Sequence, residues 1–235
     1  MDVHWLEQTS ADLPAADDWL SAGEAVRLSG MRFAKRRADW RLGRWTAKRA
    51  VSFYLNLPVE RGALAHMEIR PAPGGAPEVS FGNERAPVTI SISHRGDRAA
   101  CAVGQAAPPA CLLLGCDLEI VEPRSDAFAT DYFTAEEQRL VAQASPADRW
   151  RLLALLWSGK ESVLKALREG LRLDTRSVVV DPFTGQASGA DDWRPLRAHH
   201  DGLIFHGWWR QSDNLIRTMV ASPASASPLI AIPTV

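Results

Sequence analysis

The sequence of 235 residues has few cysteines and no long hydrophobic run. Its three cysteines form no CxxC pair, and an odd number cannot all pair within one chain, which favours a reduced protein. No stretch approaches the roughly 18 apolar residues that a membrane-spanning helix needs. The first residues lack the basic start and apolar core of a signal peptide. We therefore expect a cytoplasmic protein that does not act at a membrane.

A net excess of charge is also absent. The 27 basic and 28 acidic residues leave a net charge of -1, whereas general nucleic-acid-binding proteins usually carry a marked basic excess. The P-loop, GxGxxG, HExxH and GxSxG motifs are missing, so nucleotide binding of the usual kinds is unsupported. Any phosphate ligand would have to be held by side chains and a metal ion.

The charges are nevertheless segregated along the chain. Residues 1–26 contain six acidic residues and no Lys or Arg, whereas residues 27–49 contain nine basic residues and one acidic residue. The second segment predicts a helix from Arg27 that continues to Tyr54. Four cations of this helix form one stripe and have no acidic neighbour four residues away: Arg37, Arg41, Arg44 and Lys48. The stripe is either an ordinary solvated face or a site for a polyanion.

The remaining pattern predicts an α+β fold. Strict alternation of apolar and polar residues predicts a half-buried strand over Val88–Ser93. Thr134 and Glu137 form a capping box, and a long helix lies within Pro146–Glu169 with Gly170 as its C-cap. Further strands are expected at Glu78–Phe81, Ala99–Val103, Leu112–Ile120, Val178–Val180, Gly202–Trp209 and Ile216–Ala221.

A short linker at residues 105–109 marks the expected boundary between two domains. It separates an amino-terminal domain, residues 1–108, from a carboxyl-terminal domain, residues 109–235. The order of strands and helices fits α+β better than an array of parallel βαβ units.

Two carboxylates stand two positions apart on a predicted strand. Asp117 and Glu119 therefore project from one face, where they repel each other unless a cation joins them. Oxygen ligands at short spacing suit a hard ion such as Mg²⁺. The alternative is a pair of exposed acids at the end of a strand.

The long helix carries charge in unusual places. Lys160 falls within the apolar face, where its ammonium must meet an anion or reach solvent. Glu161 and Lys165 lie side by side at the edge of that face. A helix salt bridge worth about 0.3–0.5 kcal/mol would explain Glu161 and Lys165, but it leaves Lys160 unexplained.

His94 and Arg95 end a predicted strand. They are either ordinary surface residues or, beside an anion site, good hydrogen-bond donors to phosphate.

Taken together, these segments resemble the 4′-phosphopantetheinyl transferases of the Sfp-like type. The matching pieces are Ser91-Ile92-Ser93-His94, a GxDxE motif at 115–119 and a WxxKExxxK motif at 157–165, and the basic region Trp40–Arg44 is similar as well. The ordered set is specific, whereas GxDxE alone is weak. One departure is Gly75-Ala76-Pro77, where many members carry Gly-Lys-Pro.

The resemblance implies a fold of two similar α/β subdomains related by a pseudo-twofold. It also implies a monomer that moves the phosphopantetheine group of coenzyme A to a serine of an acyl or peptidyl carrier protein. Fatty-acid, polyketide and peptide carriers are all possible acceptors. No nucleic acid is expected as a partner.

The resemblance also assigns roles to residues. Asp117, Glu119 and Glu161 would bind Mg²⁺, Glu161 would take the serine proton, and Lys165 would stabilise or protonate the leaving phosphate. Lys160 would support the site. The phosphates of coenzyme A would be bound by Lys160 and Lys165 together with Arg37, Arg41, Arg44, His94 and Arg95.

Two other functions remain open from the residues. The same carboxylates could serve a metal-dependent phosphodiesterase or nuclease whose basic stripe grips a nucleic-acid backbone. A catalytically inactive carrier-binding module is the third reading, and the intact charged motifs argue against it.

Overall fold

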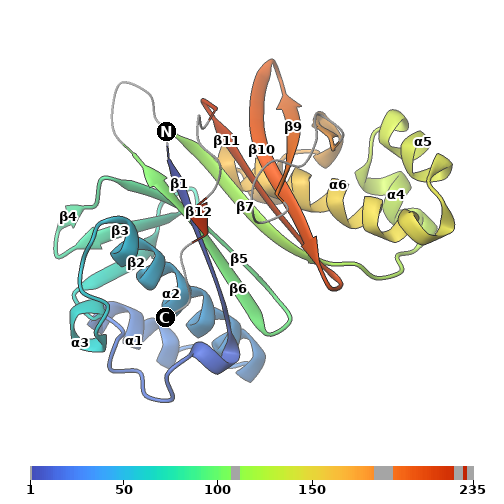
Figure 1. Ribbon diagram of the computed structural model, residues 1–235. Helices are drawn as coiled ribbons and strands as arrows, with labels where there is room; N and C mark the ends of the chain where they lie inside the picture. The colour runs from blue at the N-terminus through green and yellow to red at the C-terminus, as the bar shows by residue number, and fades with distance from the viewer. Residues whose placement is uncertain (1, 107–111, 183–192, 225–229, 232–235) are drawn as a thin grey trace. The chain divides into compact units, whose positions relative to one another are not determined.

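A computed structural model describes residues 2–106, 112–182, 193–224 and 230–231 of the chain (Figure 1). The chain forms two compact units, one of Met1–Leu112 with Ser227–Val235 and one of Leu113–Ala226. The boundary that we placed between residues 108 and 109 lies outside the described residues. Each unit combines helices with antiparallel strands, so the predicted α+β class is confirmed.

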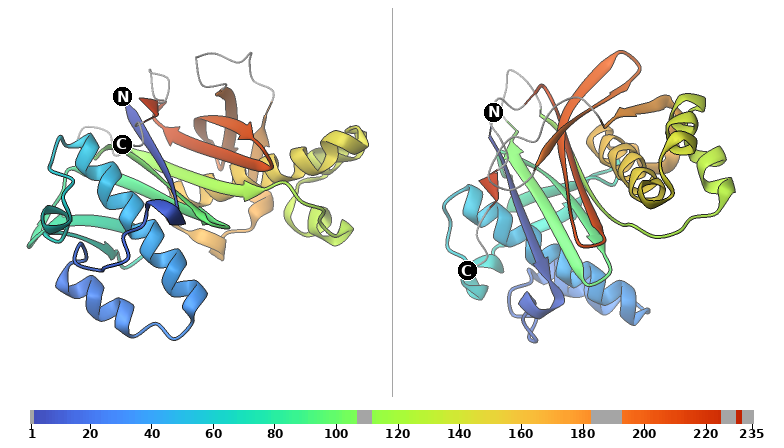
Figure 2. Two further views of the ribbon diagram at one scale, coloured as in Figure 1. Left: turned by 60° about the horizontal axis from the view of Figure 1, so that its bottom comes forward. Right: turned by 45° about the vertical axis from the view of Figure 1, so that its right-hand side comes forward.

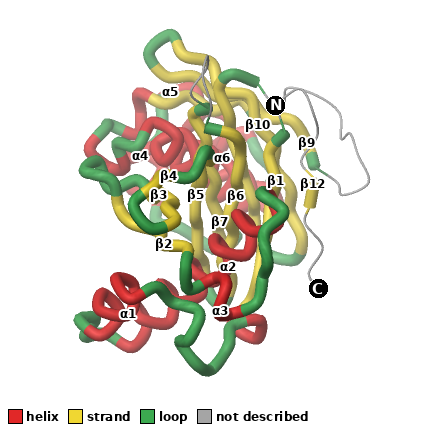
Figure 3. The backbone as a smooth tube through the Cα atoms, turned by 90° about the vertical axis from the view of Figure 1, so that its left-hand side faces the viewer, coloured by secondary structure: helices red, strands yellow, loops and turns green. Residues whose placement is uncertain are grey.

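The first unit is built on a four-stranded sheet covered by one long helix. The sheet has the order β12-β1-β6-β5, in which only β12 pairs in parallel. Helix α2 (Ala34–Tyr54) packs against β1, β5 and β6, and α1 (Ala22–Ser29) and α3 (Arg61–Leu64) belong to the same unit (red in Figure 3). The strands are β1 (Val3–Thr9), β5 (Val88–Arg95), β6 (Arg98–Gln105) and β12 (Ile230–Ala231).

A smaller sheet completes this unit. It has the order β2-β3-β4, with β2 (Met67–Pro71), β3 (Pro77–Phe81) and β4 (Glu84–Arg85). Val88 and Ile90 of β5 enter the hydrophobic core together with Ala47 and Val51 of α2, as the alternation predicts. The prediction that the strand is half-buried is wrong, because its polar side chains, Thr89, Ser91 and Ser93, are buried as well. The predicted strand at Glu78–Phe81 is confirmed as β3.

The prediction of one helix from Arg27 to Tyr54 is wrong at its start. The chain forms α1 and α2 as separate helices, and only the end at Tyr54 is as expected. Helix α1 begins at a capping box between Ser21 and Glu24 and stops at Gly30. Glycine in a helix interior costs about 1 kcal/mol relative to alanine, so it is a natural place for the break.

The second unit repeats the combination of one antiparallel sheet and one long helix. The five-stranded sheet has the order β7-β11-β10-β9-β8, and α6 (Pro146–Leu167) packs on β7 and β11. Helices α4 (Asp126–Tyr132) and α5 (Ala135–Gln143) lie beside α6 (Figure 2). The strands are β7 (Leu113–Ile120), β8 (Val178–Asp181), β9 (Arg194–His200), β10 (Leu203–Ser212) and β11 (Leu215–Ser222).

Most local predictions in this unit are confirmed. The capping box of Thr134 and Glu137 begins α5, and the expected strands correspond to β7, β8, β10 and β11. Gly170 is not the C-cap of α6, because Arg168 already takes a left-handed conformation with φ of 63° and ends the helix. Across both units, the elements that were not predicted are strands β1, β2, β4, β9 and β12 and helices α3 and α4. No helix in the described part of the chain is long and apolar enough to cross a membrane.

Gly115 allows α6 to approach β7 very closely. A Cβ atom at this position would overlap the carbonyl oxygen of Ser162 and would lie 2.8 Å from the backbone nitrogen of Ala166. Both are backbone atoms of a buried helix and cannot move without shifting α6. The glycine of the GxDxE motif is therefore required by packing.

We predict that Gly115→Ala lowers the free energy of unfolding by about 3 kcal/mol or more, because a close-packed core cannot absorb the added carbon. Urea denaturation followed by circular dichroism measures the loss. The matched control is Gly62→Ala in α3, where an added methyl group would meet no atom within 4 Å. A loss below about 1 kcal/mol for Gly115→Ala would contradict the packing argument.

Candidate active site

Asp117 and Glu119 lie on the face of β7 that α6 covers. They alternate with Gly115 along the strand, and each is only 6% exposed. Thr218 of β11 stands directly opposite Asp117 in the sheet register. The predicted orientation of both carboxylates on one face is confirmed.

Helix α6 holds both oxygens of Asp117. The ammonium of Lys165 donates to Asp117 Oδ1 at 2.8 Å and to the carbonyl oxygen of Cys116 at 3.1 Å. The hydroxyl of Ser158 donates to Asp117 Oδ2 at 3.0 Å. The helix salt bridge between Glu161 and Lys165 was the alternative explanation of these two residues; the ion pair that Lys165 forms is instead with Asp117 of β7.

Glu161 carries an unsatisfied charge. Its Oε1 atom is buried and has no hydrogen-bond partner among the described residues. Burial raises the pKa of Glu161, the charge of Asp117 raises it further, and Lys165 only partly opposes them. A carboxylate in this environment is poised to accept a proton or to gain a cation.

Glu119 is paired with an arginine that the sequence did not point to. Arg124 forms an ion pair with Glu119 and a second one with Glu122 at 3.0 Å. Its guanidinium lies 5.2 Å from the ring centre of Phe128. Arg124 belongs to no motif, although it lies only five residues after Glu119 in the sequence.

The carboxylates fit a metal ion only in part. No three His, Cys, Asp or Glu side chains in the described ranges are grouped closely enough to hold a metal ion by themselves. The carboxylate of Glu161 nevertheless has one buried oxygen with no hydrogen-bond partner among the described residues, and it lies close enough to Asp117 for the charge of Asp117 to raise its pKa. Mg²⁺ is usually bound by one or two carboxylates together with phosphate oxygens, so this donor set suits it.

Lys160 differs from the expectation that it contacts the coenzyme. Its side chain is fully buried, forms an ion pair with Glu137 at 2.8 Å and donates to the carbonyl oxygens of Thr175 and Val178. All three protons of the ammonium have partners inside the core. Lys160 is therefore a structural residue of α6, and it cannot reach a phosphate without unfolding this core.

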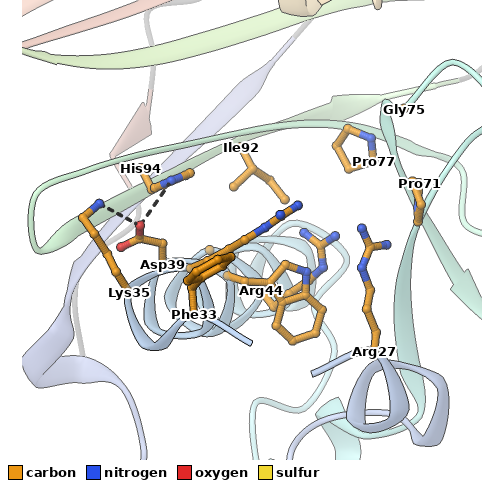
Figure 4. A pocket seen from close by; sticks show the side chains of 13 residues that line it. Arg27, Phe33, Lys35, Asp39, Arg44, Pro71, Gly75, Pro77, Ile92 and His94 are labelled. Carbon is orange, nitrogen blue, oxygen red and sulfur yellow. Dashed lines mark hydrogen bonds and ion pairs between the residues drawn. The ribbon is translucent and has the colours of Figure 1, made fainter. Parts of the chain in front are cut away.

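The first unit contains a cationic pocket of about 620 Å³ between α1, α2, β5 and the β2–β3 hairpin (Figure 4). His94 Nε2 and Lys35 Nζ lie 3.8 and 3.1 Å from the carboxylate of Asp39. Burial lowers the pKa of Arg44 to about 10, and its guanidinium stacks over Trp40. Other residues that line the pocket are Arg27, Phe33, Arg36, Gly43, Pro71, Gly75, Pro77 and Ile92.

The predicted stripe of cations is divided by the fold. Arg44 lines the pocket with His94, whereas Arg41 is held by Asp17 at 2.7 Å and by the carbonyl oxygen of Pro14. Arg37 donates to the carbonyl oxygen of Leu28. Arg37 and Arg41 line a separate pocket of about 360 Å³.

Two further cations of the prediction also lie away from the pocket. Lys48 is buried in an ion pair with Glu24, and Arg95 is not among the residues that line the pocket. The acidic partners of the stripe, Asp17 and Glu24, come from the loop and helix that precede α2. Residues this far away in the sequence are not found by looking only four positions along the helix.

Comparisons with known proteins agree with the motifs. Residues 113–209 match the family model described as the 4′-phosphopantetheinyl transferase superfamily. The 4′-phosphopantetheinyl transferase HetI of Nostoc sp. strain PCC 7120 is 25% identical over 181 residues, which are 75% of this chain and 72% of that protein. The resemblance inferred from the sequence is therefore confirmed.

Two solved structures are partly similar in fold. One is a holo-(acyl-carrier-protein) synthase from Bacillus anthracis in complex with coenzyme A, with 20% identity, a TM-score of 0.37, and coverage of 43% of this chain and 92% of that chain. The other is a holo-[acyl-carrier-protein] synthase from Helicobacter pylori, also with coenzyme A, with 16% identity, a TM-score of 0.35, and coverage of 44% and 98%.

We predict that Glu161→Gln raises the melting temperature of the metal-free protein at pH 7 and above. The raised pKa means that the folded state binds the Glu161 proton more tightly than the unfolded state. Stability from this group is therefore full at low pH and is lost as the pH rises through the folded-state pKa. Differential scanning fluorimetry from pH 4 to 9 should show a shallower decline for Glu161→Gln, and an unchanged profile would contradict the assignment.

Proposed function

We infer that this chain belongs to the 4′-phosphopantetheinyl transferase superfamily, and we propose that it transfers the phosphopantetheine group of coenzyme A to a serine of an acyl or peptidyl carrier protein. Adenosine 3′,5′-bisphosphate is the second product. The observation that carries the proposal is that Asp117, Glu161 and Lys165 form one cluster, in which Asp117 is buried and the other two are half-buried, within the region matched by the family model. We also propose that the protein acts as a cytoplasmic monomer.

The pocket of the first unit is the proposed site for the phosphates of coenzyme A. Four cations, Arg27, Lys35, Arg36 and Arg44, line it together with His94, and such donors bind phosphate well. This supply of charge compensates for Ala76, which stands where many family members carry lysine. Phe33 and Trp40 add aromatic surface that suits the adenine ring.

The carboxylates of the second unit are the proposed Mg²⁺ ligands. Asp117 and Glu161 would hold the ion, and Glu119 would join them by exchanging Arg124 for the metal. When bound, Mg²⁺ would neutralise charge on the pyrophosphate oxygens.

The proposed reaction is a displacement at phosphorus. The serine oxygen of the carrier protein forms a bond to the phosphorus that bears pantetheine, and the bond from this phosphorus to the bridging oxygen breaks. Glu161 accepts the serine proton, the role of a positioned general base. Lys165 donates a hydrogen bond or proton to the departing phosphate. Its side chain is 28% exposed beside Asp117, so a bound phosphate can reach its ammonium.

A metal-dependent phosphodiesterase or nuclease remains the alternative from the sequence. Nothing in the comparisons favours it. Incubation with single-stranded RNA or DNA and Mg²⁺ separates the two functions, because the transferase should cleave neither.

We predict that Glu161→Ala lowers the rate of transfer by about 10²–10⁴-fold, the usual contribution of a general base, and that Asp117→Ala lowers it at least as much. The measurement is the mass gain of an apo carrier protein incubated with coenzyme A and Mg²⁺. Glu169→Ala, a half-exposed acid beyond α6, is the matched control and should retain full activity. Transfer at the wild-type rate by both site variants would refute the proposed roles.

The divided stripe gives a second prediction. Arg44→Ala should raise the KM for coenzyme A roughly 10- to 100-fold, because a charge-assisted hydrogen bond contributes about 1.5–3 kcal/mol. Arg41→Ala should change it by no more than about twofold, as is typical of a residue away from the site. Steady-state kinetics with varied coenzyme A measures both. Equal effects of the two substitutions would show that the stripe acts as one surface.

A further inference from the structure

Three buried hydroxyl groups form a chain behind Asp117. Ser158 and Ser162 come from α6 and Thr218 comes from β11, and none of the three is exposed to solvent. Ser158 Oγ lies 2.8 Å from Thr218 Oγ1, which in turn lies 2.7 Å from Ser162 Oγ. The chain ends at Asp117 Oδ2, 3.0 Å from Ser158 Oγ.

Elementary hydrogen-bond chemistry gives this chain a direction. An ionised carboxylate can only accept, so the single proton of Ser158 must be donated to Asp117. The oxygen of Ser158 is then available to accept from Thr218, and the oxygen of Thr218 can accept from Ser162. Thr218 also lies within donating distance, 2.9 Å, of the carbonyl oxygen of Ser158, so its proton stays beside Ser158 in either case.

The chain complements the contact that Lys165 makes with the other oxygen of Asp117. With both oxygens held, the carboxylate cannot rotate about its Cβ–Cγ bond. Without Ser158, the Oδ2 atom of Asp117 would lose this donor, and the carboxylate could turn toward the ammonium of Lys165. Groups that orient a metal ligand in this way typically change metal affinity or activity about 10- to 100-fold when they are removed.

We propose that Ser158, Thr218 and Ser162 are positioning residues that fix the orientation of Asp117 for binding a divalent cation. The proposal rests on the proposed function in that it takes Asp117 as a metal ligand. It adds two residues of α6 and one of β11 to the machinery, none of which touches the reacting atoms.

The test is a calorimetric titration with Mn²⁺, which takes the same oxygen ligands as Mg²⁺, in the absence of coenzyme A and carrier protein. Ser158→Ala should weaken Mn²⁺ binding roughly 10- to 100-fold, and Thr218→Val, which keeps the shape of the side chain, should weaken it by about tenfold. Thr218→Ser, which keeps the hydroxyl that Thr218→Val removes, should bind Mn²⁺ with an affinity within about twofold of wild type.

Matched controls are available in the first unit. Ser52→Ala and Thr46→Val remove buried hydroxyls of α2 that have no hydrogen-bond partner among the described residues, and neither should affect Mn²⁺ binding. Melting temperatures of all variants are measured in parallel. A loss of affinity that follows melting temperature alone, controls included, would overturn the proposal in favour of a structural role.

The outcomes separate this proposal from the proposed function. Unchanged Mn²⁺ affinity in Ser158→Ala and Thr218→Val, with normal transfer by the wild-type protein, would overturn only the positioning role. If the Mn²⁺ affinities of the variants fall in the expected order but the wild-type protein transfers no phosphopantetheine, the transferase function is refuted and the positioning role stands. A wild-type protein that binds no Mn²⁺ would overturn the assignment of Asp117 as a metal ligand and the positioning proposal with it.

Discussion

A buried lysine–glutamate pair fixes the position of α6, and the arrangement of the site depends on it. Burying the ammonium of Lys160 alone would cost several kcal/mol, and this cost is offset only if an anion and hydrogen-bond acceptors surround it. Glu137 supplies the anion, and the carboxylate of Glu137 also accepts from the backbone nitrogens of Thr134 and Val180. The pair thus connects α6, α5 and β8. Because Lys160 precedes Glu161, the same contacts set the rotation of the helix that presents Glu161 and Lys165 beside Asp117.

The first unit contains a corresponding buried lysine–glutamate pair, whose lysine lies on α2. Lys48 is buried, pairs with Glu24 at 2.5 Å and donates to the carbonyl oxygens of Trp19 and Leu64. Glu24 belongs to a capping box and accepts from the backbone nitrogen of Ile69 in β2, as Glu137 does from β8. Glutamate and lysine are 24 positions apart in the first unit and 23 in the second. The two units therefore share a structural repeat made of a few widely spaced residues, which explains why no repeat is visible in the sequence.

Features set by local pattern could be predicted from the sequence, and features set by distant contacts could not. The strand at Val88–Ser93 and the capping box at Thr134 depend on neighbouring residues, and both are present in the structure. The burial of the polar face of that strand depends on the rest of the fold and was not predicted. The shared face of Asp117 and Glu119 follows from strand geometry. The partners Asp17 for Arg41 and Glu24 for Lys48 come from earlier elements, so the stripe looked uncompensated. The hydroxyl chain was missed for the same reason, since Thr218 reaches Ser158 only across the fold.

The charges of the second unit bear on the proposed binding of a metal ion together with phosphate. The three motif carboxylates, Asp117, Glu119 and Glu161, face two cations, Lys165 and Arg124, which leaves one negative charge in a buried cluster. A divalent cation bound alone would change this sum to one positive charge. A pyrophosphate added with the cation would bring the sum back below zero and supply the ligands that two or three carboxylates leave vacant. On the proposed function, the cluster therefore binds the cation more tightly when pyrophosphate accompanies it. In the metal-free protein, burial and then the charge of Asp117 raise the pKa of Glu161.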